Sequence, residues 1–298
     1  MTGATYQEVR AKSALNRLGR RGGSWSLNPY RGCLHACVYC YARAYHSYLD
    51  VDWHEDFERV VFAKTNLPEL LGRELRRPSR RGQSVCIGSA ADPYQPAEAT
   101  HRITRRCLET LADLANPCTI LTKGTLIVRD ADVLQQLAAR ASAYFSLTTL
   151  DERLARRLEP HAPPPRSRLR ALERLRALGV RTGVLLCPVL PGLTDSPAQL
   201  EAVIRAAADH GAVDVGVGAL RLAPLVKDHF LPFVDREFPR LSATYRRWYA
   251  HGAEAAWAYR SQLERLTDRL KAECGVPDHP EEGRAPPADE QLSLPLWG

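Results

Sequence analysis

Three cysteines lie within eight residues of one another in the first part of the chain. Cys33, Cys37 and Cys40 follow the spacing C-x3-C-x2-C, so their thiolates can grip one face of a single metal centre. A [4Fe-4S] cluster normally takes four cysteines, and three thiolates leave one iron with a coordination position open to another ligand. The spacing therefore predicts a [4Fe-4S] cluster that can bind a further molecule at one iron.

Two other uses of these cysteines are weighed against the cluster. A structural zinc site needs four closed ligands, commonly from two cysteine pairs, and the chain has no second C-x2-C. A redox pair at Cys37 and Cys40 would leave Cys33 without a role. Both alternatives explain less of the motif than the cluster does.

The length, hydrophobic content and charge of the chain indicate what kind of protein carries this motif. A chain of 298 residues with 45% hydrophobic content is long enough for one barrel-sized domain with a substantial core. There is no run of 18 apolar residues and no apolar segment typical of a signal peptide, so we expect a cytoplasmic protein whose eight cysteines are free thiols. The formal charge of +7 is compatible with a nucleic-acid partner and equally with a basic solvated surface.

Apolar segments alternate with helical patterns of ten or more residues through most of the chain. Such alternation predicts parallel βαβ units with right-handed crossovers. Six segments are expected to be core strands, with 59–64 as a possible extra one: 25–29, 84–88, 118–123, 143–149, 181–189 and 213–222. The fold class is therefore α/β, a partial (β/α)6 barrel whose site lies at the carboxyl ends of the strands.

The chain divides into four predicted parts. Residues 1–23 are expected to form a flexible basic arm, and residues 24–223 the barrel core. Residues 224–274 carry Trp248, Tyr249, Trp257 and Tyr259 on helical stretches and are expected to form a helical cap, in which these aromatics pack or stack on bases. Residues 275–298 begin Pro-rich and acidic, which predicts a disordered tail.

Five sequence blocks resemble the radical S-adenosylmethionine (SAM) superfamily, in particular its spore photoproduct lyase-like branch. They are NPYRGCLHACVYCYAR at 28–43, GSAADPYQPAE at 88–98, LTKGTLIVRD at 121–130, SLTTLDERLARRLEPHAPPPRSRL at 146–169 and PVLPGLTD at 188–195. The resemblance implies that SAM chelates the open iron through its amino and carboxylate groups. An electron from the cluster then cleaves SAM to give a 5′-deoxyadenosyl radical that abstracts hydrogen from an unreactive C–H bond.

The resemblance also implies a set of cofactor contacts near the cluster. Tyr39 and Tyr41 flank the last cysteine, and Gly88 and Ser89 lie where the second strand turns to receive the methionyl amino group. Asp92, in the loop that follows, could hold an amine, orient the substrate or serve only as a turn residue before a proline.

Further contacts are expected at the ends of the later strands. Thr122 and Lys123 end the third strand, and Ser146 and Thr148 lie on the fourth, where the family contacts the ribose hydroxyls or the carboxylate. Arg168 is a candidate for bidentate pairing with the methionyl carboxylate, or is a surface helix charge. The segment that begins at Pro188 is expected to lie against the adenine.

The chain departs from the spore photoproduct lyase pattern at Ser89. In that enzyme a cysteine at the matching position supplies a hydrogen atom to the product radical, and a serine O–H is a poor hydrogen-atom donor. Cys86 lies three residues earlier, within the strand, so we expect it to point to the opposite face and to belong to the core. Repair of the lyase's own thymine dimer is therefore not implied.

The end of the chain, QLSLPLWG at 291–298, is apolar after an acidic stretch. It resembles the short peptides with which bacterial replication and repair proteins bind the DNA sliding clamp, with anchors at Gln291, Leu294, Leu296 and Trp297. Docking on the protein's own surface is the alternative.

These observations predict a radical SAM enzyme that acts on a DNA lesion or another nucleic-acid substrate. It would need an electron donor such as flavodoxin or ferredoxin. A small metabolite or peptide substrate is a second hypothesis. A third is a non-catalytic iron–sulfur module that binds or senses DNA.

Overall fold

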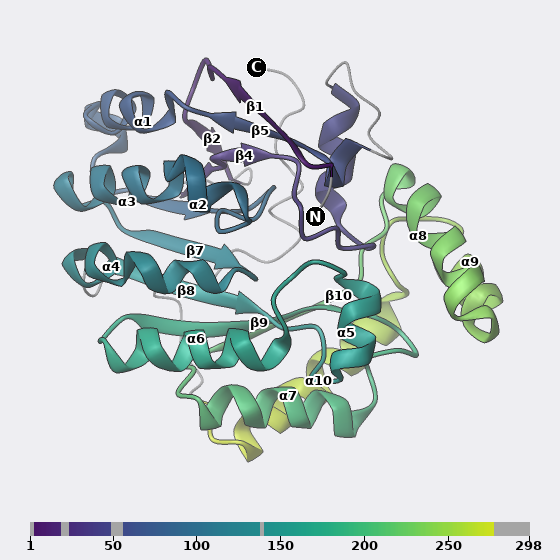
Figure 1. The fold of residues 1–298 in the computed structure, drawn as a ribbon. Coiled ribbons are helices and arrows are strands. Elements are labelled where there is room, and N and C mark those ends of the chain that lie inside the picture. Colours follow the sequence, from purple (N-terminus) through teal and green to yellow (C-terminus); the bar gives the residue numbers. More distant parts are fainter. Residues whose placement is uncertain (1–2, 19–23, 49–55, 138–139, 277–298) are drawn as a thin grey trace.

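The computed structural model describes residues 3–18, 24–48, 56–137 and 140–276. Its main sheet has seven strands in the order β10-β9-β8-β7-β6-β3-β2 (Figure 1). Six of them are parallel, as predicted: β3 (Ser24–Leu27), β6 (Ser84–Ile87), β7 (Cys118–Thr122), β8 (Ala141–Ser146), β9 (Arg181–Val189) and β10 (Val215–Ala219). The seventh, β2 (Leu15–Arg17), pairs antiparallel with β3 at the sheet edge. The α/β fold class and the partial barrel are thus confirmed.

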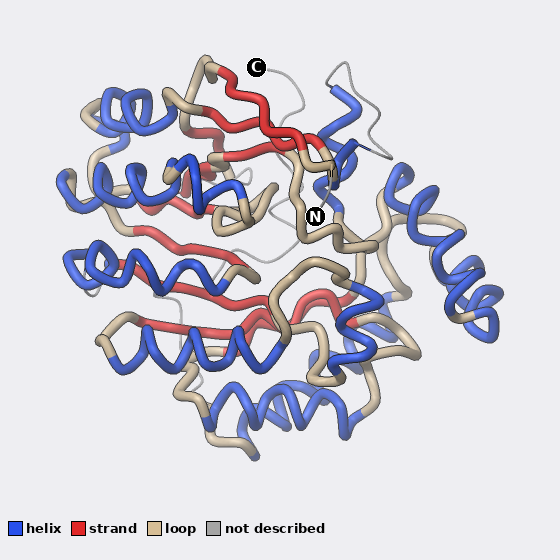
Figure 2. Tube along the Cα trace, in the orientation of Figure 1, coloured by secondary structure: helices blue, strands red, loops and turns tan. Residues whose placement is uncertain are grey.

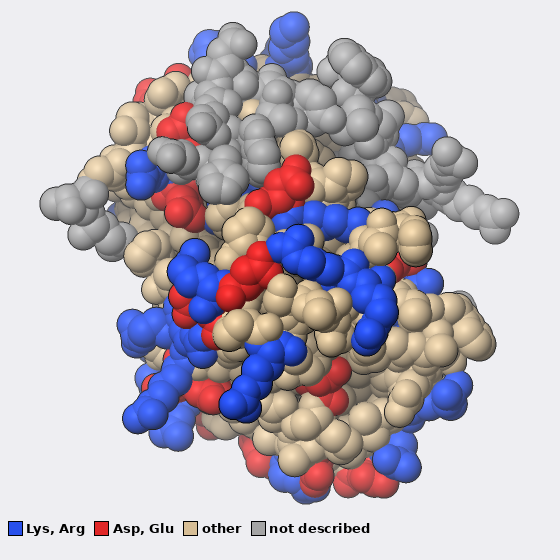
Figure 3. Space-filling view, turned by 90° about the vertical axis from the view of Figure 1, so that its right-hand side faces the viewer, with Lys and Arg blue, Asp and Glu red and all other residues tan. Residues whose placement is uncertain are grey.

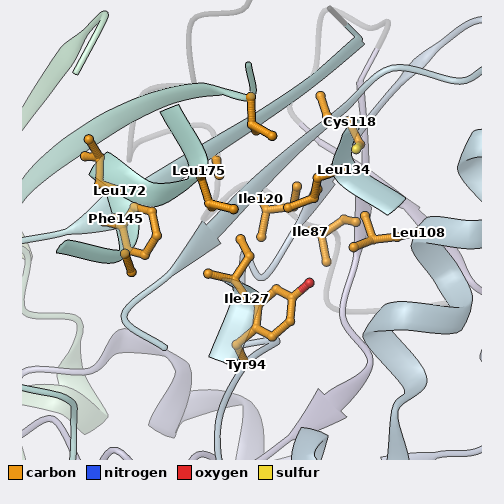
Figure 4. Packing of buried hydrophobic residues seen from close by; sticks show 14 of the residues in the cluster. Ile87, Tyr94, Leu108, Cys118, Ile120, Ile127, Leu134, Phe145, Leu172 and Leu175 are labelled. Atoms are coloured by element: carbon orange, nitrogen blue, oxygen red, sulfur yellow. The ribbon is translucent and has the colours of Figure 1, made fainter. Parts of the chain in front are cut away.

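Helices cover the outer face of this sheet (Figure 2). They are α2 (Ala97–His101), α3 (Ile103–Asp113), α4 (Ala131–Leu137), α6 (Pro165–Ala177) and α7 (Pro197–Asp209), with the short η4 (Thr125–Asp130) before α4. Ile87 and Ile120 of the strands pack with Leu108, Leu134 and Leu175 of the helices, all without solvent exposure (Figure 4). Burial of each such side chain contributes about 1.5–3 kcal/mol, so this layer is the main stabilising core.

The opposite face of the same strands lines the barrel interior. Side chains alternate along a strand, so Cys86 lies on the other face from Ile87. Cys86 packs with Leu18, Leu121 and Tyr144 in a separate small cluster. Cys86 is therefore buried as expected, but it lies inside the barrel and not beneath the helices.

The prediction of a flexible arm is wrong for part of residues 1–23. Residues Thr5–Val9 form β1, which pairs in parallel with β5 (Val60–Lys64) in a second sheet of order β1-β5-β4. The third strand, β4 (Tyr30–Arg31), comes from the start of the cysteine segment. The side chains of β1 are almost all exposed, so the strand is held by backbone pairing and carries no apolar alternation that the sequence could reveal.

Several shorter elements connect these layers. They are η1 (Tyr41–Tyr48), η2 (Asp56–Glu58), α1 (Leu67–Leu75), η3 (Pro78–Arg80) and α5 (Glu152–Leu158). Within the described residues, no helix is both long and apolar enough to cross a membrane.

The carboxyl-terminal part is helical, with α8 (Pro224–Glu237), η6 (Pro239–Leu241), α9 (Ser242–Trp248) and α10 (Trp257–Glu273). The helix α10 packs on α7 and β10, so it completes the barrel wall. Tyr249 is buried, and Trp248 packs on Tyr259 with ring centroids 5.2 Å apart, whereas Trp257 is 74% exposed. The predicted clamp peptide lies outside the described residues.

Candidate active site

The cysteine loop follows β3 at the carboxyl end of the barrel. Two tight turns fold it: the Ala36 amide donates to the Cys33 carbonyl at 3.3 Å, and the Cys40 amide donates to the Cys37 carbonyl at 3.2 Å. Ala36 adopts a left-handed conformation with φ of 55°, which lets the loop reverse direction between the first two cysteines. After Cys40 the chain enters η1.

The three thiols are free and largely shielded from water, with Cys33 and Cys37 each 7% exposed. Burial raises the pKa of all three, and that of Cys37 to about 12, although Lys123 opposes the shift at Cys37 and Cys40. Each thiol must lose its proton to bind a metal. Three neighbouring cysteines with a nearby ammonium fit a cluster that holds three thiolates, because the cation offsets part of the added negative charge.

Among the residues that the structure describes, no three His, Cys, Asp or Glu side chains are grouped tightly enough for one metal ion. The assignment of a cluster to Cys33, Cys37 and Cys40 therefore rests on their spacing in the sequence and on their common loop.

Asp92 anchors one side of the cysteine loop to the third barrel strand. It accepts hydrogen bonds from the Thr122 hydroxyl and the Lys123 amide, both at 2.6 Å. His35, within the loop, places Nδ1 3.3 Å from Asp92 Oδ2. Burial alone would raise the pKa of Asp92, but His35 and these hydrogen bonds hold the pKa at about 2. The carboxylate is thus ionised and links the loop to the strand end.

Glu159 anchors the other side. Its carboxylate accepts hydrogen bonds from the Tyr39 hydroxyl and from Thr148 Oγ1, the latter at 2.9 Å. Arg168 forms a buried ion pair with it, and Lys123 Nζ lies 3.9 Å away. Burial would raise the pKa of Glu159, but Arg168 and Lys123 hold it at about 2. Glu159 is not among the residues predicted from the sequence, because no spacing pattern marks it.

Arg168 is 1% exposed, so it is not a surface helix charge. Its Nε donates to the Pro163 carbonyl at 2.7 Å and its Nη1 to the Ser146 carbonyl at 2.9 Å, while Nη2 bonds Glu159. All three guanidinium nitrogens thus bond protein oxygens. The contact between Arg168 and the methionyl carboxylate stays a prediction. The neighbouring Lys123 ammonium makes fewer bonds to the protein than the Arg168 guanidinium does.

The turn after β6 lies against the same loop. Ser89 Oγ accepts from Asn28 Nδ2 at 3.1 Å, and the Tyr41 hydroxyl donates to the Ser89 carbonyl. Gly88 has φ of 91°, and a Cβ there would lie 2.4 Å from the Leu121 carbonyl oxygen, so glycine is required. Asn28, which the sequence analysis did not single out, also accepts from the Ala90 amide at 2.7 Å and ties this turn to the cysteine segment.

The structure therefore brings most of the predicted residues to one end of the barrel. Tyr39, Thr148 and Lys123 meet at Glu159, while Thr122 meets Asp92. Pro188 lies near the end of β9 and follows a cis peptide bond. The individual cofactor contacts of these residues remain predictions.

Known proteins similar to this chain support the assignment of the cysteine loop to a radical SAM site. Residues 27–205 match the family model described as the radical SAM superfamily. An uncharacterized protein of Mycobacterium tuberculosis is 37% identical over 300 residues, covering 99% of this chain and 87% of its own length. An uncharacterized protein of Methanocaldococcus jannaschii is 28% identical over 190 residues, covering 63% of this chain and 69% of its own length.

Solved structures of spore photoproduct lyase share the fold. A complex with the dinucleoside spore photoproduct superposes with a TM-score of 0.68 at 13% identity, covering 90% of this chain and 79% of the lyase. A lyase mutant with bound SAM and the same dinucleoside gives 0.67 at 14% identity with the same coverage. Because residues 27–205 match the radical SAM family model, this chain belongs to the radical SAM superfamily and is a radical SAM enzyme, with a [4Fe-4S] cluster and SAM as its cofactors.

Proposed function

We propose that this radical SAM enzyme acts on nucleic acid, with a damaged base in DNA as its substrate. The observation that carries the proposal is a set of exposed arginines around the carboxyl end of the barrel, where the cysteine loop lies. We call Arg153, Arg156, Arg240 and Arg247 the rim arginines.

The rim arginines come from α5, η6 and α9. They lie on either side of the end of α8: Arg157 of α5 bonds the side chain of Glu237, the last residue of α8, at 3.1 Å and stacks on Phe238 at 4.1 Å, while η6 and α9 both pack on α8. All four rim arginines are exposed, and among the described residues none has an acidic partner within salt-bridge distance. Figure 3 shows many Lys and Arg side chains on this face of the molecule, with Asp and Glu side chains between them. Unpaired guanidinium groups suit phosphate oxygens, which they bind in bidentate fashion.

An exposed aromatic ring lies at the same end. The Leu222 amide donates to the Ala253 carbonyl at 2.7 Å, and Arg221 bridges to Glu254, so residues 253–257 lie beside the segment that follows β10. Trp257 thus stands at the barrel rim with most of its surface in water. An unpaired base could stack on such a ring, with about 1–3 kcal/mol per base.

The solved lyase structures favour the same substrate class, because that enzyme holds a dinucleoside. By the sequence resemblance, Ser89 stands at the lyase's hydrogen-donor position, so we do not extend the lyase's own reaction to this chain. In the bound enzyme, cluster and SAM supply the 5′-deoxyadenosyl radical. The chain's own part is to hold the loop through Asp92 and Glu159 and to present the substrate at the rim.

Salt-dependent DNA binding tests the proposal. The variant Arg153→Ala/Arg156→Ala is compared with Arg170→Ala/Arg174→Ala, a pair of exposed arginines on α6 of the outer layer. If the two rim arginines contact phosphates, their removal lowers the slope of log affinity against log salt by about 2, whereas the α6 pair leaves it unchanged. Equal slopes in both variants would favour a small metabolite or peptide substrate.

Turnover provides the second test. The reconstituted enzyme is incubated with dithionite, SAM and DNA that carries defined lesions, and 5′-deoxyadenosine is quantified. DNA-stimulated formation that falls in the rim variant supports a nucleic-acid substrate. Formation that no DNA stimulates contradicts it.

Two partners are proposed from the sequence alone. The segment with Gln291 and Trp297 would bind the sliding clamp, and flavodoxin or ferredoxin would supply the electron. A peptide of residues 288–298 that competes with the whole chain for the purified clamp would support the first, and a Trp297→Ala chain with unchanged clamp affinity would contradict it.

A further inference from the structure

A second group of arginines surrounds a hollow at the opposite end of the barrel. The hollow has a volume of about 210 Å³ and is lined by Arg17, Arg77, Arg80, Ser24, Ser79, Trp25 and Gln83. Ser24 begins β3 and Gln83 precedes β6, so the hollow lies at the amino ends of these parallel strands. The cysteine loop follows the carboxyl end of β3, and the hollow is therefore separate from the active site.

Trp25 positions two of the arginines. The Arg80 guanidinium lies 4.3 Å from the centre of the indole ring and that of Arg17 lies 5.9 Å from it, both within cation–π range. The indole itself is fixed, because its N–H donates to Gln83 Oε1 at 2.5 Å. The Arg80 guanidinium is thus held in place without a ligand, and Arg17 lies beside the same ring, which lowers the ordering cost of binding a ligand to these two groups.

The charge around the hollow is not balanced by its lining. The lining contains three arginines and no carboxylate. Arg80 forms an ion pair with Glu74, whose carboxylate also accepts the backbone amides of Ala14 and Leu15. Within the described chain, Arg17 and Arg77 have no acidic partner at salt-bridge distance. The hydroxyls of Ser24 and Ser79 add two further donors.

We propose that this hollow binds a phosphate group. Guanidinium groups offer paired N–H donors that match phosphate oxygens, and serine hydroxyls complete such sites. The volume suits a phosphate with a small part of the molecule that carries it. In this proposal the Trp25 ring contacts the arginines and does not itself bind the ligand.

The phosphate could belong to a free nucleotide or to a nucleic-acid backbone, and the experiment separates the two. Isothermal titration of the reconstituted full chain uses inorganic phosphate, pyrophosphate, a nucleoside monophosphate and a short single-stranded oligonucleotide. The test variant is Arg17→Gln/Arg77→Gln, which changes two exposed side chains. The matched control is Arg170→Gln/Arg174→Gln on α6, and thermal melts check that both variants fold.

We expect saturable phosphate or pyrophosphate binding by the native chain and by the α6 control, weakened at least about tenfold in the Arg17→Gln/Arg77→Gln variant. A nucleotide that binds more tightly than the oligonucleotide assigns the hollow to a small ligand. The reverse order, with the same loss in the variant, assigns it to the backbone. No saturable binding by the native chain, or equal affinities in both variants, would overturn the proposal.

This site does not depend on the rim arginines. A chain that binds phosphate at the hollow but shows no rim-dependent salt slope would leave the hollow standing and remove the proposed function. The opposite result would remove the hollow alone.

Discussion

Arginine side chains in the barrel interior and on the barrel rim differ in their bonding partners. Beneath the cysteine loop, Arg168 is almost fully buried and its guanidinium nitrogens bond Glu159 and two carbonyl oxygens. At the rim, Arg153 and Arg156 are exposed and have no acidic partner among the described residues. A buried charge without a partner would cost several kcal/mol, so the bonds from Arg168 to Glu159 and to the two carbonyl oxygens are needed for the stability of the fold. Surface cations carry no such requirement and remain available to a ligand.

The cysteine loop should give the largest effect of any change at the interior. Replacing Cys37 with Ala removes one of three cluster ligands, so we expect loss of the cluster and of all SAM cleavage. Iron and sulfide content, the visible absorption of the cluster and 5′-deoxyadenosine formation measure this. Cys118→Ala is the matched control, because Cys118 is buried at the amino end of β7. A Cys37→Ala protein with a full complement of iron would contradict the assignment.

The buried pair should come next. Glu159→Gln leaves Arg168 charged and poorly compensated, so we expect a loss of about 3–5 kcal/mol in the free energy of unfolding. Urea unfolding of the cofactor-free chain measures it. Glu237→Gln, which breaks the exposed pair with Arg157, is the control and should leave the unfolding midpoint unchanged. Similar midpoints for the two variants would mean that Glu159 is not the interior anchor.

Asp92 should have a smaller effect, because its partners are a hydroxyl, backbone amides and one histidine. Asp92→Asn keeps the shape but loses the charge-assisted bonds, and we expect a cost of about 1–3 kcal/mol near neutral pH. The folded pKa of about 2 lies below the unfolded value. The stabilisation by the ionised carboxylate is therefore complete above the unfolded pKa of about 4 and is lost as the pH falls towards 2.

Urea unfolding of the cofactor-free chain at several pH values tests this sign. The stability difference between native chain and Asp92→Asn should shrink as the pH falls from 5 towards 2. A constant difference would show that Asp92 contributes through its shape and not through its charge.

The sequence predicted the framework better than the interior network. The six parallel strands follow from apolar runs such as residues 181–189, and the cysteine loop follows from its spacing. Glu159 could not be found in this way, because its role depends on Tyr39, Thr148 and Arg168 meeting at one point of the fold. The strand β1 was missed for the opposite reason, since backbone pairing holds it and its side chains face water.

The rim should show the smallest effect on stability and still a clear effect on function. Arg153→Ala/Arg156→Ala removes two side chains that have no acidic partner in the described structure, so we expect a change within about 0.5 kcal/mol in the free energy of unfolding. The same variant should weaken binding to DNA, most of all at low salt, where phosphate contacts count most. Urea unfolding measures the free energy of unfolding, and titration of the same preparation with DNA measures the affinity for DNA. A variant that loses stability as strongly as Glu159→Gln would show that these arginines hold the fold, and the contrast between interior and surface charge would fail.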